Sequence, residues 1–317
     1  MYPIQLMYTT GQQRIDDTLR GMIGIFEAAF PGRIWSYYLV GSYVDGSATP
    51  LSDVDVRIIF KGDFAAGEEE RMRQVRECCR LISPIAIDCP PLCEARLLHD
   101  EDWLHEPLGI KADGQLLYGE AIGDSFPEPA FSAYVRNVTA VPVSRFGRIR
   151  GQSRLRFPLA YPDPAGEFYG YVRRIGPPWA RVPSTKDLVH MVGFAATCLI
   201  ALEAERMVTR KRDWLELYKE TIGDGWTPLL EAVYVRCKEA WSYRLPEDEG
   251  ERGRLRDICG QIVAFENYYL TCYRTFLLTE LQSGDSARQR FAVARLNEVV
   301  YPDEEIQAAL RGIERDG

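Results

Sequence analysis

Residues 38–60 read YLVGSYVDGSATPLSDVDVRIIF, and this stretch decides the fold of the N-terminal part of the chain. It begins inside an apolar run, Ile34 to Val40, that predicts a buried strand. A Gly-Ser pair and several turn residues follow, and a second apolar run then carries two aspartates. The pattern predicts two neighbouring strands joined by a turn and a short helix.

The two aspartates of the second strand are the first candidate site. Side chains two apart on a strand point to one face, so we expect Asp53, Asp55 and Arg57 to lie together. Neighbouring carboxylates repel each other unless a cation neutralises them. Mg²⁺ prefers carboxylate oxygens and also binds substrate phosphates, so the pair predicts a Mg²⁺ site.

The Gly-Ser pair is the second candidate feature. Gly41 permits a close approach of the backbone to a ligand. Ser42, at the expected start of a helix, offers hydroxyl and amide donors to a phosphate.

Together these residues resemble the signature of the polymerase-β-like nucleotidyltransferases, in which a Gly-Ser turn precedes an Asp-x-Asp strand. The matching positions are Gly41, Ser42, Gly46, Ser52, Asp53 and Asp55. One departure is Asp45, because many members carry an arginine before the second glycine. The alternative interpretation is a hairpin with a chance Asp-Val-Asp in its second strand.

The resemblance implies a third carboxylate from a neighbouring strand. Residues 83–89, SPIAIDC, predict such a strand and end it near Asp88. Asp88 would be the general base toward an acceptor hydroxyl or a further metal ligand. The alternatives are that Asp88 only forms a turn, or that Glu94 takes its task.

Residues 207–218, MVTRKRDWLELY, place three cations at the start of a predicted helix, against the preference of the helix dipole. Aminoglycoside nucleotidyltransferases have a similar element whose lysine reaches the nucleotide phosphates. The resemblance therefore implies that Lys211 binds phosphate, with Arg210 and Arg212 as alternatives. A solvated surface cluster is the competing interpretation.

The chain of 317 residues, with 46% hydrophobic residues, is long enough for two domains. We predict an α/β (α+β) fold, in which a small mixed-sheet nucleotidyltransferase domain is followed by an α-helical bundle. The expected boundaries are 1–123 for the catalytic domain, 124–183 for a connecting segment and 184–317 for the helical domain.

Helical periodicity predicts further elements of the chain. The expected helices are 12–30, 68–82, 128–139 and 249–281, with two short ones at 286–299 and 303–313. Ser184 and Asp187 together resemble a capping box that starts another helix. From Arg145 to Pro183 the sequence is rich in proline and aromatic residues and predicts an ordered loop.

The net charge of −8 and the pI near 5.2 argue against a general nucleic-acid or anionic-membrane binder. They suit a cationic acceptor. Residues 99–106 hold four acids, which either line a cleft for such an acceptor or form an exposed helix end. The sequence contains neither a basic leader nor an apolar run of membrane-spanning length, so we expect a cytoplasmic protein.

The predicted activity is Mg²⁺-dependent transfer of a nucleoside monophosphate, AMP from ATP, to a hydroxyl of a small cationic acceptor such as an aminoglycoside. Antibiotic resistance is the role that this resemblance implies. Alternatives are modification of a protein or tRNA, as in some toxin–antitoxin systems, and a nucleotide-binding pseudoenzyme. The partners are a nucleoside triphosphate and the acceptor, and a homodimer is compatible with the sequence.

Overall fold

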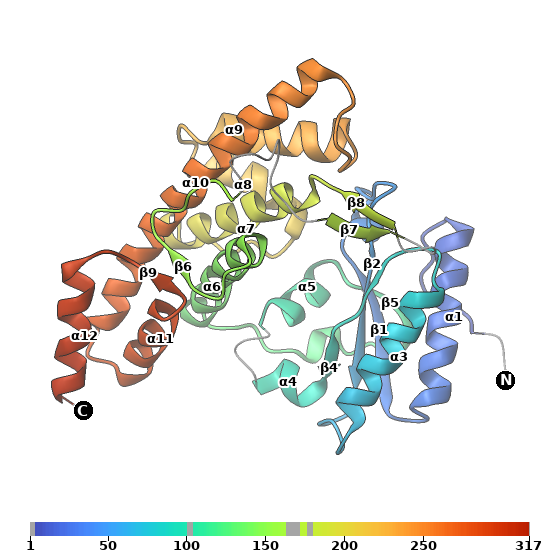
Figure 1. The fold of residues 1–317 in the computed structure, drawn as a ribbon. Coiled ribbons are helices and arrows are strands. Elements are labelled where there is room, and N and C mark those ends of the chain that lie inside the picture. Colours follow the sequence, from blue (N-terminus) through green and yellow to red (C-terminus); the bar gives the residue numbers. More distant parts are fainter. Residues whose placement is uncertain (1–3, 100–103, 163–171, 176–179, 317) are drawn as a thin grey trace. The chain divides into compact units, whose positions relative to one another are not determined.

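The computed structural model describes residues 4–99, 104–162, 172–175 and 180–316. The chain forms two compact units (Figure 1). The first consists of Met1–Asn137, Val172–Val182 and Thr209–Asp213, and the second of Val138–Tyr171, Pro183–Val208 and Trp214–Gly317. A mixed sheet in the first unit and a largely helical second unit confirm the predicted fold class.

The first unit is built on a five-stranded sheet. Strand β1 (Ile34–Val40) lies between β2 (Val54–Phe60) and β5 (Gln115–Gly119) and is antiparallel to both. The outer edge of β2 pairs in parallel with β3 (Ile87–Asp88) at one end and with β4 (Pro91–Cys93) at the other. Strand β2 is therefore enclosed on both edges along its length.

Helices cover both faces of this sheet. In Figure 1, α1 (Gln13–Ala29) and α3 (Glu68–Ile82) lie on one side of the strands, and α4 (Glu94–His99) and α5 (His105–Asp113) lie on the other. The α1 side contains the larger apolar core, to which β2 contributes Val54, Val56, Ile58 and Phe60. The polar positions of β2 alternate with these and face the side of α5.

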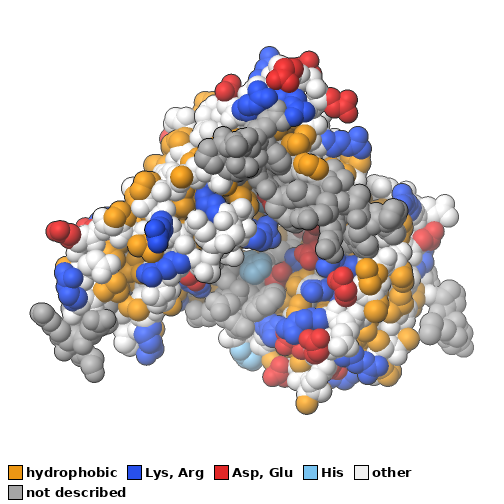
Figure 2. All heavy atoms as spheres, in the orientation of Figure 1, with side chains coloured by type: hydrophobic (Ala, Val, Ile, Leu, Met, Phe, Trp, Pro, Cys, Tyr) orange, Lys and Arg blue, Asp and Glu red, His pale blue; other side chains and the backbone are white. Residues whose placement is uncertain are grey.

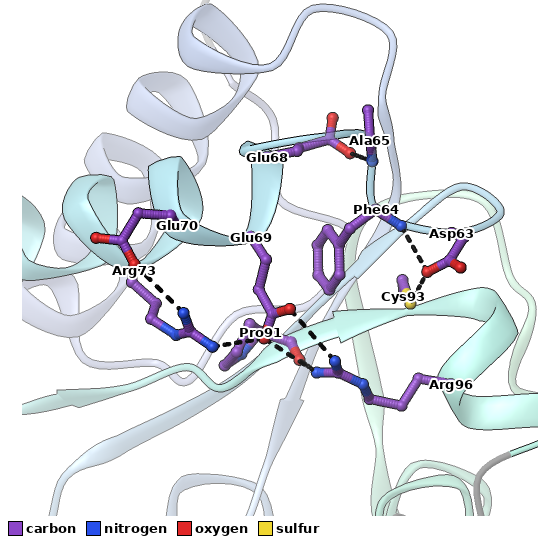
Figure 3. Close-up of polar contacts among 10 residues, drawn as sticks. All are labelled: Asp63, Phe64, Ala65, Glu68, Glu69, Glu70, Arg73, Pro91, Cys93 and Arg96. Carbon is purple, nitrogen blue, oxygen red and sulfur yellow. Dashed lines mark hydrogen bonds and ion pairs between the residues drawn. The ribbon is translucent and has the colours of Figure 1, made fainter.

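A polar network at the start of α3 joins this helix to α4 and β4 (Figure 3). Glu69 accepts hydrogen bonds from Arg73 at 2.7 Å and from Arg96 at 3.4 Å. Arg96 also donates to the carbonyl oxygen of Pro91 at 2.9 Å, which ties α4 to β4 and α3. The acidic first turn of α3, which suits the helix dipole, thus also joins three elements.

The second unit contains most of the remaining helices. They are α7 (Lys186–Glu203), α8 (Trp214–Thr221), α9 (Thr227–Ala232), the π-helix η4 (Val233–Ala240), α10 (Glu249–Leu281), α11 (Ser286–Leu296) and α12 (Glu304–Asp316). Helix α7 packs against α8, α10 and η4. Short strands β6 (Leu155–Arg156) and β9 (Val299–Val300) pair in parallel within this unit. A further two-stranded sheet joins β7 (Val172–Ile175) to β8 (Ala180–Pro183), and all of it except Pro183 is assigned to the first unit.

Several elements differ from the sequence-based expectation. The helix expected at 128–139 is α6 (Phe131–Arg150), which continues through Pro142 and crosses the division between the units. Helix α7 begins at Lys186 after Thr185, whose side chain forms no cap, and Oγ of Ser184 accepts a hydrogen bond from the amide of Lys186 at 3.2 Å. Asp187 instead lies 3.3 Å from Arg148 in an ion pair. Of the aromatic loop expected up to Pro183, residues 163–171 and 176–179 fall outside the described residues.

Two further observations bear on the type of protein. None of the described helices combines the length and apolar character that crossing a bilayer requires. No disulfide joins any of the cysteines, all of which lie in described parts of the chain.

Candidate active site

The turn after β1 brings the backbone against the carboxylate of Asp55. Gly41 has φ 77° and ψ −151°, a conformation that is essentially restricted to glycine. A Cβ atom at this position would lie 2.7 Å from Oδ2 of Asp55. Glycine is therefore required here twice, for the backbone conformation and for the close approach.

The connection from Gly41 to Asp53 is organised by its own polar side chains. Ser42 opens the short helix α2 (Ser42–Asp45), which ends at Gly46 in the left-handed conformation. Asp45 Oδ1 accepts a hydrogen bond from the amide of Ser47 at 2.8 Å. Asp45, the residue that departs from the family signature, thus closes the turn after α2.

The second half of this connection is held by Ser52. Its Oγ accepts a hydrogen bond from the amide of Thr49 at 2.9 Å, and Ser52 itself is buried. This bond fixes the chain immediately before Asp53 and the start of β2. The two ends of the connection are therefore fixed by local hydrogen bonds.

The strand register brings Asp55 and Asp88 side by side. Asp55 pairs with Val40 of β1 on one edge of β2 and with Asp88 of β3 on the other. Residues directly opposite each other in neighbouring strands project from the same face of a sheet. The charges of Asp53 and Asp88 both act on Asp55, which indicates that the three predicted acids lie near one another.

The electrostatics of Asp55 reflect this crowding. Burial, followed by the charges of Asp53 and Asp88, raises the pKa of Asp55 to about 6. The positive charges of Lys211 and Arg57 act in the opposite direction without cancelling the effect. The ionised carboxylate of Asp55 therefore lacks full compensation from the protein itself.

Lys211 lies in η3 (Lys211–Asp213), and its charge acts on Asp55. This residue was expected in the helical domain, but Thr209–Asp213 belongs to the first unit together with the aspartates. Arg210 instead pairs with Asp113 at 3.2 Å, and Arg212 lies 3.5 Å from its neighbour Asp213. Of the three candidate cations, Lys211 has the largest effect on the pKa of Asp55.

Glu94, the alternative to Asp88, lies elsewhere. Its Oε2 accepts a hydrogen bond from the amide of Gly62 at 2.9 Å, beyond the Phe60 end of β2. Positions 55 and 62 are about 20 Å apart along an extended chain. This distance excludes Glu94 from the cluster of Asp53, Asp55 and Asp88.

The sequence did not predict the environment of Arg57. Its Nε donates a short hydrogen bond to Oε2 of Glu106, which is buried on α5. Glu106 therefore neither lines a cleft nor sits at an exposed helix end, as the acidic run had suggested. Arg57 and Glu106 are far apart in the chain, and no local pattern signals such a pair. Residues 100–103 of that run lie outside the described part.

These donors fit a hard divalent cation that arrives with a nucleotide. Within the described residues, no three His, Cys, Asp or Glu side chains are arranged as a ready-made metal cage. Mg²⁺ is usually held by one or two carboxylates together with water and substrate phosphates, so such a cage is not needed. The carboxylate of Asp55 has a raised pKa and lies near Asp53 and the backbone of Gly41. It therefore suits the binding of Mg²⁺ together with a nucleotide.

Comparisons with known proteins agree with this geometry. Residues 19–88, which include β1, the Gly41 turn, β2 and Asp88, match the family model described as a nucleotidyltransferase domain. Residues 19–88 are therefore similar to a nucleotidyltransferase domain.

A solved structure extends the likeness beyond that domain. It is spectinomycin adenyltransferase AAD(9) from Enterococcus faecialis, crystallised with ATP and spectinomycin. The likeness has a TM-score of 0.50 and 10% sequence identity, and it covers 79% of this chain and 98% of that one. The fold thus resembles that of an aminoglycoside nucleotidyltransferase, as the sequence predicted. No curated protein matches the chain in sequence.

Proposed function

We propose that this protein transfers AMP from ATP to a hydroxyl group of a small cationic acceptor, with aminoglycosides as the leading class. The observation that carries the proposal is the register of Asp55 with Asp88 beside the Gly41 turn, because it gathers carboxylates where a glycine lets the backbone approach the Asp55 carboxylate closely. The nucleotidyltransferase family match over residues 19–88 supports the type of reaction.

Each residue of the cluster then has a defined task. Asp53 and Asp55 would hold Mg²⁺, with Asp88 as a further ligand or as the base. When bound, Mg²⁺ would shield the charge of the triphosphate. The backbone of Gly41 and the donors of Ser42 would hold the outer phosphates, and Lys211 would offset the negative charge that builds up on them.

The chemical step is a displacement at the α-phosphorus of ATP. The acceptor oxygen forms a bond to that phosphorus, the bond from phosphorus to the bridging oxygen breaks, and pyrophosphate leaves. Asp88 accepts the proton of the attacking hydroxyl. The products are an AMP ester of the acceptor and pyrophosphate.

The proposed class of acceptor follows from charge. The net charge of −8 favours a cationic small molecule over a polyanion. On the face drawn in Figure 2, acidic and basic side chains are interspersed, whereas a nucleic-acid acceptor calls for a basic footprint. The structural neighbour was crystallised with ATP and spectinomycin, which supports testing that compound first.

The test follows the α-phosphate of ATP. Purified protein is incubated with Mg²⁺, ATP labelled at the α-phosphate, and separately with spectinomycin, streptomycin, kanamycin, bulk tRNA or a protein extract. Label should move to one of the aminoglycosides, with one pyrophosphate released per AMP transferred. Transfer to tRNA or protein alone would replace the proposed acceptor class. Tight ATP binding without any transfer would indicate a pseudoenzyme.

A further inference from the structure

We propose that Glu106 is a positioning residue that holds Arg57 away from Asp55 and Asp88, which keeps these carboxylates available to a metal-bound nucleotide. The inference rests on the proposed function, because it assigns to Asp55 a cationic ligand from outside the chain. It concerns two residues outside the family signature, one on β2 and one on α5.

Arg57 stands where it competes most directly with a metal ion. It follows Asp55 by two positions on β2 and therefore projects from the same face. The two positions lie about 7 Å apart, a distance that an arginine side chain spans. Asp88 lies across the ladder from Asp55, within the same neighbourhood. A guanidinium free to turn would find two carboxylates beside it.

In the structure, the guanidinium is engaged by Glu106 instead. Nε of Arg57 donates to Oε2 of Glu106, and both side chains are largely buried, with 14% and 8% of their surface exposed. Oε1 of Glu106 lies 3.5 Å from Nε2 of His105, so both carboxylate oxygens face a donor. Glu106 is thus anchored on α5 and holds Arg57 from the side of the helix.

The anchoring leaves one donor of Arg57 unsatisfied. Nη1 is buried and has no hydrogen-bond partner among the described residues. A buried donor without a partner favours any movement that supplies an acceptor. Asp55 and Asp88 are the carboxylates that would supply one, since their charges already act on Arg57.

The charges around this pair favour the same interpretation. Against the effect of burial, Arg57 and His105 lower the pKa of Glu106 to about 2. Glu106 therefore stays ionised throughout the working range and remains a constant partner for Arg57.

Removal of the Glu106 charge should redirect Arg57. In Glu106→Gln the side chain keeps its shape, but the guanidinium loses its ionic partner and turns toward Asp55 or Asp88. The cation then occupies the carboxylates that the metal requires. Residues that support metal ligands from the second layer typically change metal affinity by about 10–100-fold when mutated. For Glu106→Gln we expect the affinity for the metal nucleotide to fall about tenfold, which is the lower end of that range.

The experiment measures binding of Mn²⁺ together with α,β-methylene ATP, an analogue that cannot transfer AMP, by titration calorimetry. The variants are Glu106→Gln, the double variant Arg57→Met/Glu106→Met, and Glu68→Gln. The last is a matched control, because Glu68 pairs with Arg33 at 2.8 Å in the same unit, at the other end of β2. Circular dichroism and thermal melts establish that each variant is folded.

Glu106→Gln should bind the metal nucleotide about tenfold more weakly, and Glu68→Gln should bind it as the wild type does. The double variant should recover wild-type affinity or exceed it, because the competing cation is gone. Unchanged affinity in Glu106→Gln would overturn the inference. A folded double variant that binds at least as weakly as Glu106→Gln would also overturn it, since Glu106 would then act through packing alone.

The double variant keeps the test decisive should Glu106→Gln not fold, because a tenfold loss of affinity in the folded double variant contradicts the inference by itself. A different experimental result would show that the proposed function itself is wrong. A wild-type protein that binds no metal nucleotide overturns the proposed function and this inference with it, whereas normal wild-type binding with unaltered variants overturns the inference alone.

Discussion

The carboxylates near the two ends of β2 have pKa values that are shifted in opposite directions. At the Phe60 end, Arg33 and Glu68 form two hydrogen bonds of 2.8 Å, and the pairing with Arg33 lowers the pKa of Glu68. At the other end, burial and neighbouring acids raise the pKa of Asp55 to about 6. Near the Phe60 end the carboxylate of Glu68 is paired with an arginine, whereas at the other end the carboxylate of Asp55 keeps a raised pKa despite the charges of Lys211 and Arg57.

The backbone differs between the two ends in the same sense. Gly41 and Gly62 both have positive φ, at 77° and 63°. A Cβ atom at Gly62 would meet nothing within 4 Å, whereas one at Gly41 would strike Asp55. Crowding and unfavourable charge are thus confined to the Asp55 end. Such local costs typically mark the part of a fold that is kept for function.

Loss of an acid at the Asp55 end should have the largest effect. Asp55→Asn removes the charge that would hold Mg²⁺, which contributes several kcal/mol to stabilising the transition state, so AMP transfer should fall at least about a thousandfold. The matched control is Glu94→Gln at the Phe60 end, for which we expect near-normal rates. Initial rates of pyrophosphate release measure both. A strong loss in Glu94→Gln with normal Asp55→Asn would reverse the assignment of the two ends.

Asp88→Asn should slow transfer by about 10²–10⁴-fold through loss of the general base. The binding of ATP should change much less than the rate, since the proton is needed only during the chemical step. Rates and ATP affinity are measured on the same preparation. Equal losses in affinity and rate would indicate that Asp88 acts mainly as a metal ligand.

A methyl group at Gly41 should disturb the site more than one at Gly62. Gly62→Ala should lose about 1–2 kcal/mol of stability for its positive φ, and Gly41→Ala should lose more because its conformation is essentially restricted to glycine; denaturant unfolding measures both. Only in Gly41→Ala does the added methyl group displace the carboxylate of Asp55. We therefore expect an additional fall in the transfer rate of about tenfold or more, because small displacements at a reacting centre slow the reaction strongly. Identical behaviour of the two variants would argue against a functional role for the close approach.

Lys211→Ala should weaken ATP binding or slow transfer by about tenfold, a typical effect of one partly exposed charge on a phosphate. Arg212→Ala serves as the control, because Arg212 lies beside Asp213 in the same short helix. Titration calorimetry with ATP and Mg²⁺ provides the comparison. Equal effects of both variants would indicate a general electrostatic contribution of this helix instead of a specific contact.

Local patterns predicted elements of both units. Strand β1 and helix α10 have the expected bounds, because strong apolar periodicity defines both. The helix expected to end at residue 139 continues through Pro142, since tertiary packing overrides the local preference of proline. The Gly41 turn and the aspartates of β2 were recognisable because the signature is contiguous.

The rest of the site depends on contacts that sequence spacing does not encode. The pairing of Asp55 with Asp88 and of Arg57 with Glu106 is set by strand register and by the packing of α5. The association of Thr209–Asp213 with the first unit is also a tertiary property. A motif therefore predicted which acids would be present, but not which basic residues would surround them.

The most direct test of the contrast between the two ends of β2 is the pH dependence of the free energy of unfolding. An Asp with a pKa of about 6 in the folded protein, against 3.8 ordinarily, favours folding at low pH and loses that contribution as the pH rises through 6. Asp55→Asn lacks the charge, so the ligand-free variant should be more stable than the wild type by about 1–3 kcal/mol near pH 8.

The measurement is urea unfolding of the wild type and of Asp55→Asn, without ligand, between about pH 4 and pH 8. We predict that the variant is the more stable protein at the upper end and that the difference shrinks steadily toward the lower end. A variant that is less stable than the wild type near pH 8 would contradict the account, because Asp55 would then be a compensated structural carboxylate like Glu68.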